Sequence, residues 1–304
     1  MLSRGNNTLK IHTYAKSVLD MTKIKTKNYF QAPLPFQGQK RSFIKRFKEA
    51  LLEFPEDGIY VDLFGGSGLL SHTVKQFYPN STVIWNDFDN YQKRLTNVAK
   101  TNKILEYLKI ILSGHPKKEK LTIGMKEKVI DLLKNEEIKG YVDYLTLSSS
   151  LLFSGNYAKD LKGFEKQSLY NRITQSGYNC DGYLEKVIRV SQDYKSLYSS
   201  FGPIDRIIFL IDPPYLSTDT ASYNSDSYWK LKDYLDVLNL LEGNNYFYFT
   251  SNKSQVIELV EWMGDRSFSK NPFENSNILK NNNNVSYTAK YIDIMIYKIE
   301  DKSK

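Results

Sequence analysis

Five consecutive apolar residues, Ile207–Ile211, predict a strand that is buried on both faces, as in a parallel sheet. The strand ends abruptly at Asp212, because Pro213 and Pro214 can neither donate to a β-ladder nor lead straight into a helix. Tyr215 follows. Asp-Pro on its own is typical of a simple turn. A carboxylate, two prolines and an aromatic ring at the carboxyl end of a strand, where α/β sheets bind ligands, predict a functional site.

The remaining pattern mixes strand and helix periods, which predicts an α/β fold. Further strands are predicted at Ile59–Phe64, Thr82–Asn86, Tyr246–Thr250 and Tyr291–Ile299. Helices are predicted at His12–Met21, Lys40–Phe54, from the glycines at 65–68 to Phe77, and at Tyr91–Leu112, Ile123–Leu133, Val142–Leu152, Trp229–Leu241 and Val256–Met263. Two polar stretches are predicted to be irregular: Ser217–Ser227 as a mobile lid and Asn271–Asn284 as an asparagine-rich loop.

A glycine turn follows the predicted strand Ile59–Phe64. Its residues are Gly65, Gly66, Ser67 and Gly68, and a helix comes next. Strand, glycine turn and helix bring backbone N–H groups close to a nucleotide. Asp87 ends the next strand, 19 residues beyond Gly68, where α/β nucleotide folds place a carboxylate on the ribose hydroxyls. The structural alternative for Asp87 is an N-cap of the following helix.

Residues 90–200 form a longer, mostly helical and polar region that lacks a regular βα alternation. Within it, residues 155–183 interleave lysines and an arginine with five tyrosines or phenylalanines. We interpret residues 100–185 as an insertion that carries a recognition surface suited to nucleic acid. The alternative is a small helical subdomain with a tyrosine-rich core.

Composition narrows the class of protein. The 304 residues are 41% apolar and 14% aromatic, which is compatible with a packed core and argues against wholesale disorder. The single Cys180 excludes an intrachain disulfide, and neither a CxxC motif nor a histidine pair marks a zinc site. No stretch has the length and apolarity of a membrane span, and the N-terminus lacks an apolar signal core. An intracellular soluble protein is expected.

The net charge of +8 is unevenly placed. Residues 1–48 hold eleven Lys or Arg against the single acid Asp20, a local net charge of +10, which leaves −2 for the rest. We therefore interpret residues 1–32 as a basic N-terminal arm. Such an arm suits a polyanion whose phosphates release counterions on contact, although a solubilising tail would have the same composition.

Together, these motifs resemble the Dam-type, or alpha-group, adenine-N6 DNA methyltransferases. The similar segments are Pro35–Lys40, Asp62–Gly68 and Asp212–Tyr215, with a helical insertion before the last of them. That order of loop, cofactor glycines, recognition region and catalytic tetrapeptide is the order of the family. The resemblance covers roughly residues 33–100 and 190–299. One position departs from the family pattern, because Gln39 stands where a second adjacent glycine is usual.

The resemblance implies a Rossmann-like methyltransferase sheet, mostly parallel with a C-terminal antiparallel strand. It implies an S-adenosylmethionine-binding catalytic domain at 33–99 and 186–304, with a mainly helical target-recognition domain inserted at 100–185. The implied catalytic residues are Asp212, Pro213, Pro214 and Tyr215. The implied cofactor residues are Phe36, Gln37, Gly38, Lys40, Asp62, Phe64, Gly65, Gly66, Ser67, Gly68, Asp87, Asp193 and Tyr194. Ser251-Asn252 resembles the Ser-Asn pair after the next strand.

The chemistry explains these residue types. The exocyclic amine of adenine is a poor nucleophile, and a site that accepts both of its hydrogens favours a tetrahedral nitrogen. Asp212 can accept one hydrogen and the Pro213 carbonyl the other, while Tyr215 can stack on the base. The base must first be flipped out of the duplex, at a cost of roughly a few kcal/mol. Cys180 is not in a Pro-Cys setting, which argues against cytosine-C5 chemistry.

The expected function is sequence-specific adenine-N6 methylation of double-stranded DNA with S-adenosylmethionine, in the cytoplasm of a bacterial or phage-infected cell. Other planar NH₂ groups remain as alternatives: cytosine N4 of DNA, RNA adenine or a protein glutamine amide. A catalytically degenerate DNA-binding protein is the non-enzymatic alternative. The recognition sequence, a partnership with a cognate restriction endonuclease, and the oligomeric state are left open by the sequence.

Overall fold

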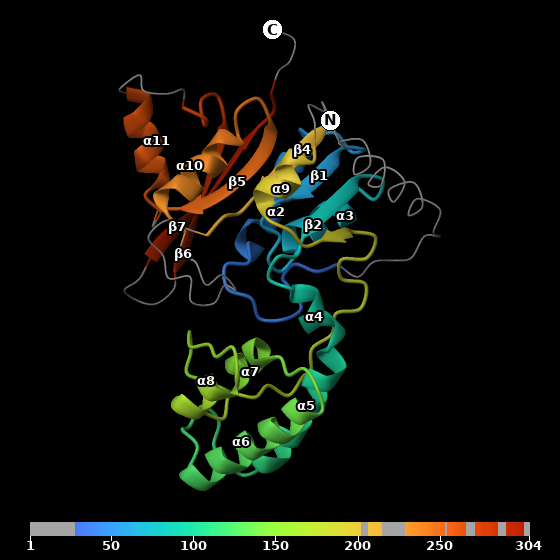
Figure 1. Ribbon diagram of the computed structural model, residues 1–304, viewed down its shortest axis with the longest axis vertical. Coiled ribbons are helices and arrows are strands. Elements are labelled where there is room, and N and C mark those ends of the chain that lie inside the picture. Colours follow the sequence, from blue (N-terminus) through green and yellow to red (C-terminus); the bar gives the residue numbers. More distant parts are fainter. Residues whose placement is uncertain are drawn as a thin grey trace, which may run out of the picture. The chain divides into compact units, whose positions relative to one another are not determined.

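The computed structural model describes residues 28–201, 206–214, 229–252, 254–265, 271–284 and 290–300. Residues 1–27 of the basic arm, with its predicted helix at His12–Met21, the predicted lid at Ser217–Ser227 and Tyr215, which was expected to stack on the base, lie outside the described residues. The chain divides into two compact units (Figure 1). The first takes in the chain up to Gln31, Gly38–Asp89 and the chain from Gly182 onward, and the second takes in Ala32–Gln37 and Asn90–Asp181.

The first unit is built on a seven-stranded sheet in the order β3-β2-β1-β4-β5-β7-β6. Its strands are β1 (Ile59–Asp62), β2 (Thr82–Asn86), β3 (Ile188–Val190), β4 (Ile207–Ile211), β5 (Asn245–Ser251), β6 (Asn277–Asn284) and β7 (Lys290–Lys298). The first five strands of that order are parallel, whereas β7 runs antiparallel to both β5 and β6. The expected α/β fold, mostly parallel with an antiparallel C-terminal strand, is confirmed.

Helices cover both faces of this sheet. They are η1 (Arg41–Phe43), α2 (Ile44–Leu51), α3 (Leu69–Phe77), α9 (Tyr194–Ser199), α10 (Leu231–Asn239) and α11 (Val256–Asp265). All five residues of β4 are buried. Ile207, Phe209 and Ile211 belong to the core shared with α9, α10 and α11, while Ile208 and Leu210 belong to the core shared with α2 and α3. A strand buried on both faces needs apolar residues at every position, which explains the uninterrupted run.

Two sequence-based expectations about the first unit were wrong. The stretch predicted as an asparagine-rich loop contains β6 over Asn277–Asn284, paired along its whole length with β7. Asparagine disfavours strands, but the ladder of a neighbouring strand overrides that preference. The helix predicted over Lys40–Phe54 is shorter, since it starts with the single 3₁₀ turn η1 and ends at Leu51.

The second unit is helical within its described residues. Its helices are α4 (Tyr91–Thr96), α5 (Val98–Ile111), α6 (Ile123–Ile138), α7 (Tyr144–Leu151) and α8 (Leu161–Lys166). The helix predicted over Tyr91–Leu112 is interrupted at Asn97, whose φ of −104° and ψ of 14° are not helical. The N-cap residues Thr122, Asp143 and Asp160 each accept a hydrogen bond from a backbone N–H, which fixes where α6, α7 and α8 begin.

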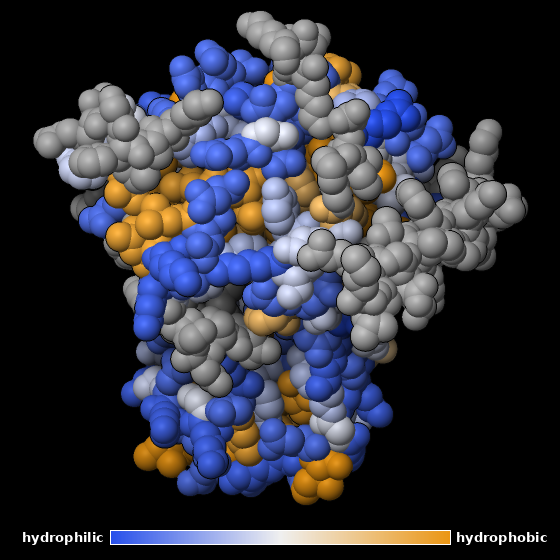
Figure 2. All heavy atoms as spheres, turned by 45° about the horizontal axis from the view of Figure 1, so that its top comes forward, coloured by the Kyte–Doolittle hydropathy of each residue, from blue (hydrophilic) through white to orange (hydrophobic). Residues whose placement is uncertain are grey.

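The core of the second unit consists mainly of leucine, isoleucine and valine side chains, and Tyr144 is the one tyrosine among its buried members in the described chain. Tyr107 and Tyr157 are exposed. The alternative of a tyrosine-rich core therefore does not describe this unit. Figure 2 shows its surface, on the face presented, as largely hydrophilic with scattered apolar side chains. No helix among the described residues is long and apolar enough to cross a membrane.

Candidate active site

Five polar positions follow the five parallel strands at one edge of the sheet. Asp62 ends β1 and Ser251 ends β5, while Asp87, Asp193 and Asp212 come shortly after β2, β3 and β4. Parallel strands point the same way, so these carboxyl ends share an edge. The chain leaves β1 toward β2 and leaves β4 toward β5, which lies on the opposite side. The β1/β4 junction is thus the topological switch point at which such sheets bind ligands.

Lys40 and Asp212 form a close ion pair at this junction. The Lys40 ammonium lies 2.6 Å from the Asp212 Oδ2 atom and also donates to the Gly38 carbonyl at 2.7 Å. Only 5% of the lysine side chain is exposed. Burial raises the pKa of the Asp212 carboxyl, the Lys40 charge opposes that rise, and the Asp293 charge adds to it. The loop residue and the catalytic carboxylate predicted from the sequence therefore belong to one arrangement.

Asp62 is a buried carboxylate with one satisfied and one unsatisfied oxygen. The Ser71 hydroxyl donates to Oδ2 at 2.7 Å, while Oδ1 has no hydrogen-bond partner among the described residues. Burial raises the pKa of the Asp62 carboxyl to about 7; the Ser71 hydrogen bond opposes this rise, and the Asp212 charge adds to it. An unpartnered buried oxygen beside the glycine turn is suited to a donor group of a bound molecule.

The glycine turn fits tightly over Trp85 of β2. A Cβ on Gly65 would lie 2.1 Å from Cδ1 of that indole, so no side chain is tolerated there. Gly66 and Gly68 have φ values of 46° and 74°, in the left-handed region that favours glycine. The Trp85 Nε1 atom is buried and has no hydrogen-bond partner among the described residues. Trp85 on the strand beneath the turn therefore requires glycine at position 65.

Asp87 is fully buried and does not cap a helix. The helix after it, α4, begins at Tyr91 with Asn90 as its N-cap residue, so the capping alternative is wrong. Instead, the Arg189 Nε atom of β3 lies 2.7 Å from the Asp87 Oδ2 atom. The neighbouring Asn86 amide donates to the carbonyls of Leu63 and Gln192, which ties together the ends of the strands on either side. The carboxylate expected to bind ribose is thereby held at the edge.

Asp193 and Tyr194 start helix α9. The Asp193 carboxylate accepts hydrogen bonds from the backbone N–H groups of Lys195 and Ser196, so it serves as the N-cap. The Tyr194 ring packs on Phe64, with centroids 4.9 Å apart, and stacks on Trp229 at 5.7 Å. An aromatic cluster of Phe64, Tyr194 and Trp229 thus borders the glycine turn.

The loop predicted to line the methyl donor begins in the second unit and ends in the first. In the second unit, the Phe36 ring meets Tyr91 edge-on at 5.6 Å, and the Tyr91 hydroxyl donates to the Leu34 carbonyl at 3.1 Å. Arg94 donates to the Pro35 carbonyl at 2.7 Å. Gln37 is the last residue of this part, and the first unit resumes at Gly38, whose φ is 81°.

The ends of β5 and β7 complete the edge. Asn252 exchanges two hydrogen bonds with the backbone of Ile292, and Ser251 stands opposite Asp293 in the β5–β7 register. Asp293 is a buried acid that the sequence analysis missed. Its signal was present, because it is the only charged residue in the apolar run Ile292–Tyr297. Arg189 could not be recognised in the same way, because β3 has only three residues and therefore shows no clear pattern in the sequence.

Comparisons with known proteins identify the family. The model of the family described as D12 class N6 adenine-specific DNA methyltransferase matches residues 36–286. The chain belongs to this family. A Haemophilus influenzae protein named "Putative methyltransferase" is 36% identical over 293 residues, which cover 94% of this chain and 98% of that relative. The resemblance seen in the sequence motifs is therefore confirmed.

Membership of the D12 class makes the chain an adenine-specific DNA methyltransferase. Its substrate is DNA, the acceptor is the N6 amine of adenine, and the reaction requires a methyl donor.

Proposed function

We propose that this D12-class enzyme transfers a methyl group from S-adenosylmethionine to the N6 amine of an adenine flipped out of a specific site in double-stranded DNA, in the cytoplasm of a bacterial or phage-infected cell. The observation that carries this proposal is the Lys40–Asp212 pair at the sheet's switch point. It sets a partly buried carboxylate at the end of β4, the strand next to β1, which leads into the glycine turn. Donor and acceptor chemistry can thus meet at one edge.

The residues at this edge fit S-adenosylmethionine, whose sulfonium supplies an electrophilic methyl group. The unpartnered Asp62 oxygen would accept a hydrogen bond from the ammonium group in the methionine part of the donor. The loop Phe36–Lys40 would line the same part of the donor. Buried Asp87 would accept from the ribose hydroxyls. Asp193 and Tyr194, beside Phe64, would hold the adenine ring. Gly65–Gly68 would allow the close approach of backbone to ligand.

The carboxyl end of β4 would handle the target base. Asp212 would accept one N6 hydrogen and the Pro213 carbonyl the other, which favours a nitrogen lone pair directed at the methyl group. The nitrogen must lose a proton after transfer. A carboxylate whose pKa is raised by burial is the better acceptor for that proton, and Lys40 keeps enough charge on Asp212 for its first role. Tyr215 would stack on the base.

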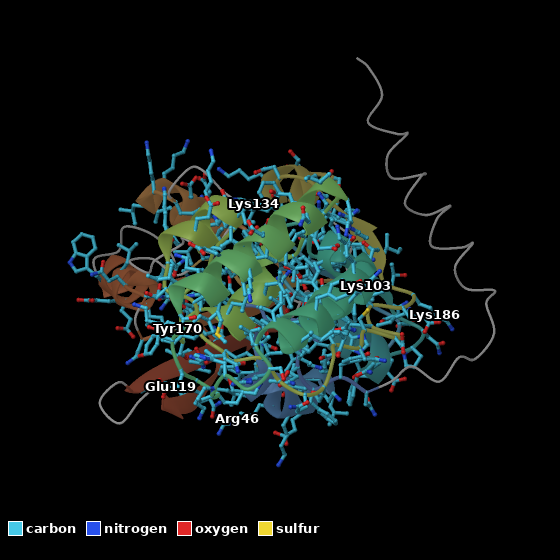
Figure 3. All side chains as sticks on the ribbon, turned by 90° about the horizontal axis from the view of Figure 1, so that it is seen from below. Arg46, Lys103, Glu119, Lys134, Tyr170 and Lys186 are labelled. Atoms are coloured by element: carbon cyan, nitrogen blue, oxygen red, sulfur yellow. The ribbon has the colours of Figure 1, made fainter. Side chains whose placement is uncertain are left out.

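The second unit would contact the DNA. It carries sixteen Lys or Arg and ten Asp or Glu, a net charge of +6, which is most of the +8 of the whole chain. Figure 3 shows Tyr170 and Glu119 close together, away from Lys134. Lys120 pairs with Tyr170 in an isolated β-bridge, and the Tyr170 ring lies 5.8 Å from that of Phe153, which is 60% exposed.

This cationic and aromatic patch of Lys118, Lys120, Phe153 and Tyr170 suits a nucleic-acid contact, because phosphates attract the lysines and bases stack on rings. The Lys118→Ala/Lys120→Ala double variant should lower the slope of log affinity against log salt by about 1.8, at about 0.9 per lost phosphate contact. Lys134→Ala, which removes a lysine paired with Glu165, is the control and should leave the slope unchanged. An unchanged slope in the double variant would exclude the patch.

The reaction itself is tested by incubating the purified full chain with DNA and S-adenosylmethionine labelled in its methyl group. Nucleosides from the digested DNA are then identified by mass spectrometry. We expect N6-methyl-2′-deoxyadenosine with wild-type protein. The control variant Asp57→Ala, which removes an exposed carboxylate, should give the same product. Asp212→Ala should abolish it. Labelled N4-methylcytosine, label in RNA only, or an active Asp212→Ala variant would overturn the proposal. Sequencing of the modified bases would give the recognition site.

A further inference from the structure

Tyr183 and Leu184 lie directly after the point at which the chain re-enters the first unit, and both are buried against the glycine turn. The Tyr183 hydroxyl donates to the Ser67 carbonyl at 2.9 Å. A Cβ built on Gly68 would lie 2.7 Å from Leu184 Cδ1, and its three nearest atoms all belong to Leu184. Two successive residues from a distant part of the chain thus fix both the carbonyl of Ser67 and the space above Gly68.

His72, on the first turns of α3, holds this two-residue segment in place. Its Nδ1 atom accepts a hydrogen bond from the Leu184 backbone N–H at 3.1 Å. Its ring lies 4.6 Å from the Tyr183 ring, and Tyr29 packs edge-on against both rings. Only 1% of the histidine is exposed. A buried imidazole that receives a backbone donor stabilises a backbone conformation, here that of Leu184.

Leu184 needs such support, because its backbone is in the left-handed region with a φ of 59°. Bulky residues rarely adopt this conformation, and it persists only where the surroundings enforce it. The glycine turn has the opposite property. Glycines permit many backbone conformations, so a turn built from Gly65, Gly66 and Gly68 gains nothing from its own side chains. The turn has one hydrogen bond of its own, from the Gly68 N–H to the Gly65 carbonyl at 2.6 Å. Leu184, held in its strained conformation, adds a constraint above Gly68 that the glycines cannot supply.

We propose that Tyr183, Leu184 and His72 are positioning residues that hold the Ser67–Gly68 backbone in the conformation that receives the methyl donor. The inference rests on the proposed binding of S-adenosylmethionine at Gly65–Gly68. None of the three residues was assigned a role from the sequence. Their effect on affinity follows from preorganisation, since a turn already in its bound conformation loses less freedom on binding.

The decisive variant is Tyr183→Phe, which removes one hydroxyl and keeps the ring. Its matched control is Tyr60→Phe, because the buried Tyr60 hydroxyl also donates to a backbone carbonyl, that of Pro55, at 2.9 Å. Hydrogen–deuterium exchange at the amides of residues 65–69 is measured on the full chain without cofactor. We expect exchange there to accelerate about fivefold in Tyr183→Phe and not in Tyr60→Phe, for the loss of one hydrogen bond. Equal exchange in both variants would overturn the proposal.

Binding of S-adenosylmethionine is then measured by calorimetry, and turnover is measured with DNA. Tyr183→Phe should raise the Kd and KM for the donor about five- to tenfold, with kcat at saturation within about twofold of wild type. Melting temperatures of the two variants should agree. An equal rise in Kd for both variants would also contradict the positioning role. If wild-type protein binds no S-adenosylmethionine, the proposed function fails, and the exchange measurement alone decides the positioning role.

His72 offers an independent check by conservative rescue. His72→Asn places an amide oxygen near the position of Nδ1 and can still accept from the Leu184 N–H, whereas His72→Leu cannot. We expect exchange at residues 65–69 to stay near wild type in His72→Asn and to accelerate in His72→Leu. Identical exchange in the two variants would show that the imidazole acts by its bulk alone and would overturn its part in the proposal.

Discussion

Lys40 and Asp212 are 172 positions apart in the chain, yet the Lys40 Nζ atom lies 2.6 Å from Asp212 Oδ2. The lysine lies just before η1 and the carboxylate just after β4. Their contact joins the loop Phe36–Lys40 to the tetrapeptide that begins at Asp212. It also moderates the effect of burial on the pKa of Asp212.

Loss of the Lys40 charge should impair turnover more than donor binding. In Lys40→Met the pKa of Asp212 rises further, so a larger fraction of the carboxyl is protonated and cannot accept an N6 hydrogen. We expect kcat to fall about a hundredfold at pH 7, as for loss of a positioned catalytic group. Because the folded pKa moves up, the acid limb of the pH–rate profile should move to higher pH and the deficit should shrink at pH 9. Arg41→Ala, which changes an exposed neighbour, should show neither effect.

Donor binding should depend on pH through Asp62. Its pKa of about 7 means that much of the carboxyl is protonated just below neutrality, whereas the ammonium of the donor binds the charged form. The Kd for S-adenosylmethionine should therefore rise about tenfold for each pH unit below 7 and level off above it. Calorimetry between pH 5.5 and 8.5 measures this. A Kd that is independent of pH, or an identical slope in Asp62→Asn, would contradict the role.

The same carboxyl should limit stability at high pH. Its folded-state pKa is raised, so the folded chain binds more protons than the unfolded chain between about pH 4 and 7, and stability falls as pH rises through this window. Asp62→Asn removes the cost of burying the charge. Chemical denaturation should find the variant more stable than wild type at pH 8, by up to about 4 kcal/mol, and little different at pH 4. Greater stability of the variant at pH 4 than at pH 8 would refute this assignment.

Arg189 should support donor binding indirectly. Arg189→Ala leaves the buried Asp87 without the Arg189 Nε–Oδ2 contact. Because 41% of the arginine side chain is exposed, solvent screens the pair, and we expect a loss of about 1–2 kcal/mol in stability. The Kd for the donor should rise about tenfold, which corresponds to a similar free energy. Arg206→Ala breaks the exposed pair with Asp57 and is the control, which should change neither quantity.

The second unit should depend on the buried pair of Arg94 and Asp143. The Arg94 Nε atom lies 3.1 Å from both carboxylate oxygens, and Asp143 also caps α7 by accepting from the Thr146 N–H. Asp143→Ala removes the cap and leaves the arginine buried without its counter-charge, at a cost of about 3–5 kcal/mol. Thermal unfolding should show the loss. Lys134→Ala, in a surface pair with Glu165, should alter the melting temperature by little.

Most of the sheet could be predicted from local pattern. Runs such as Ile207–Ile211 must be apolar throughout because both faces are covered, and that requirement is visible in any single strand. The two strands that local pattern did not predict lack such a visible requirement. The strand at Asn277–Asn284 is polar and forms only through its pairing with β7, and the three residues of β3 are too few to show a period.

The sequence by itself determined the α/β class, the glycine turn, the tetrapeptide from Asp212 and the family that these motifs resemble, because each depends on residues that are neighbours in the chain. Tertiary structure decided what surrounds them. It brought Lys40 to Asp212, Arg189 to Asp87 and Tyr183 to Ser67, and it buried Asp62 so that its pKa rises. Such contacts join residues far apart in sequence. Their electrostatic effect depends on burial, which no local pattern specifies.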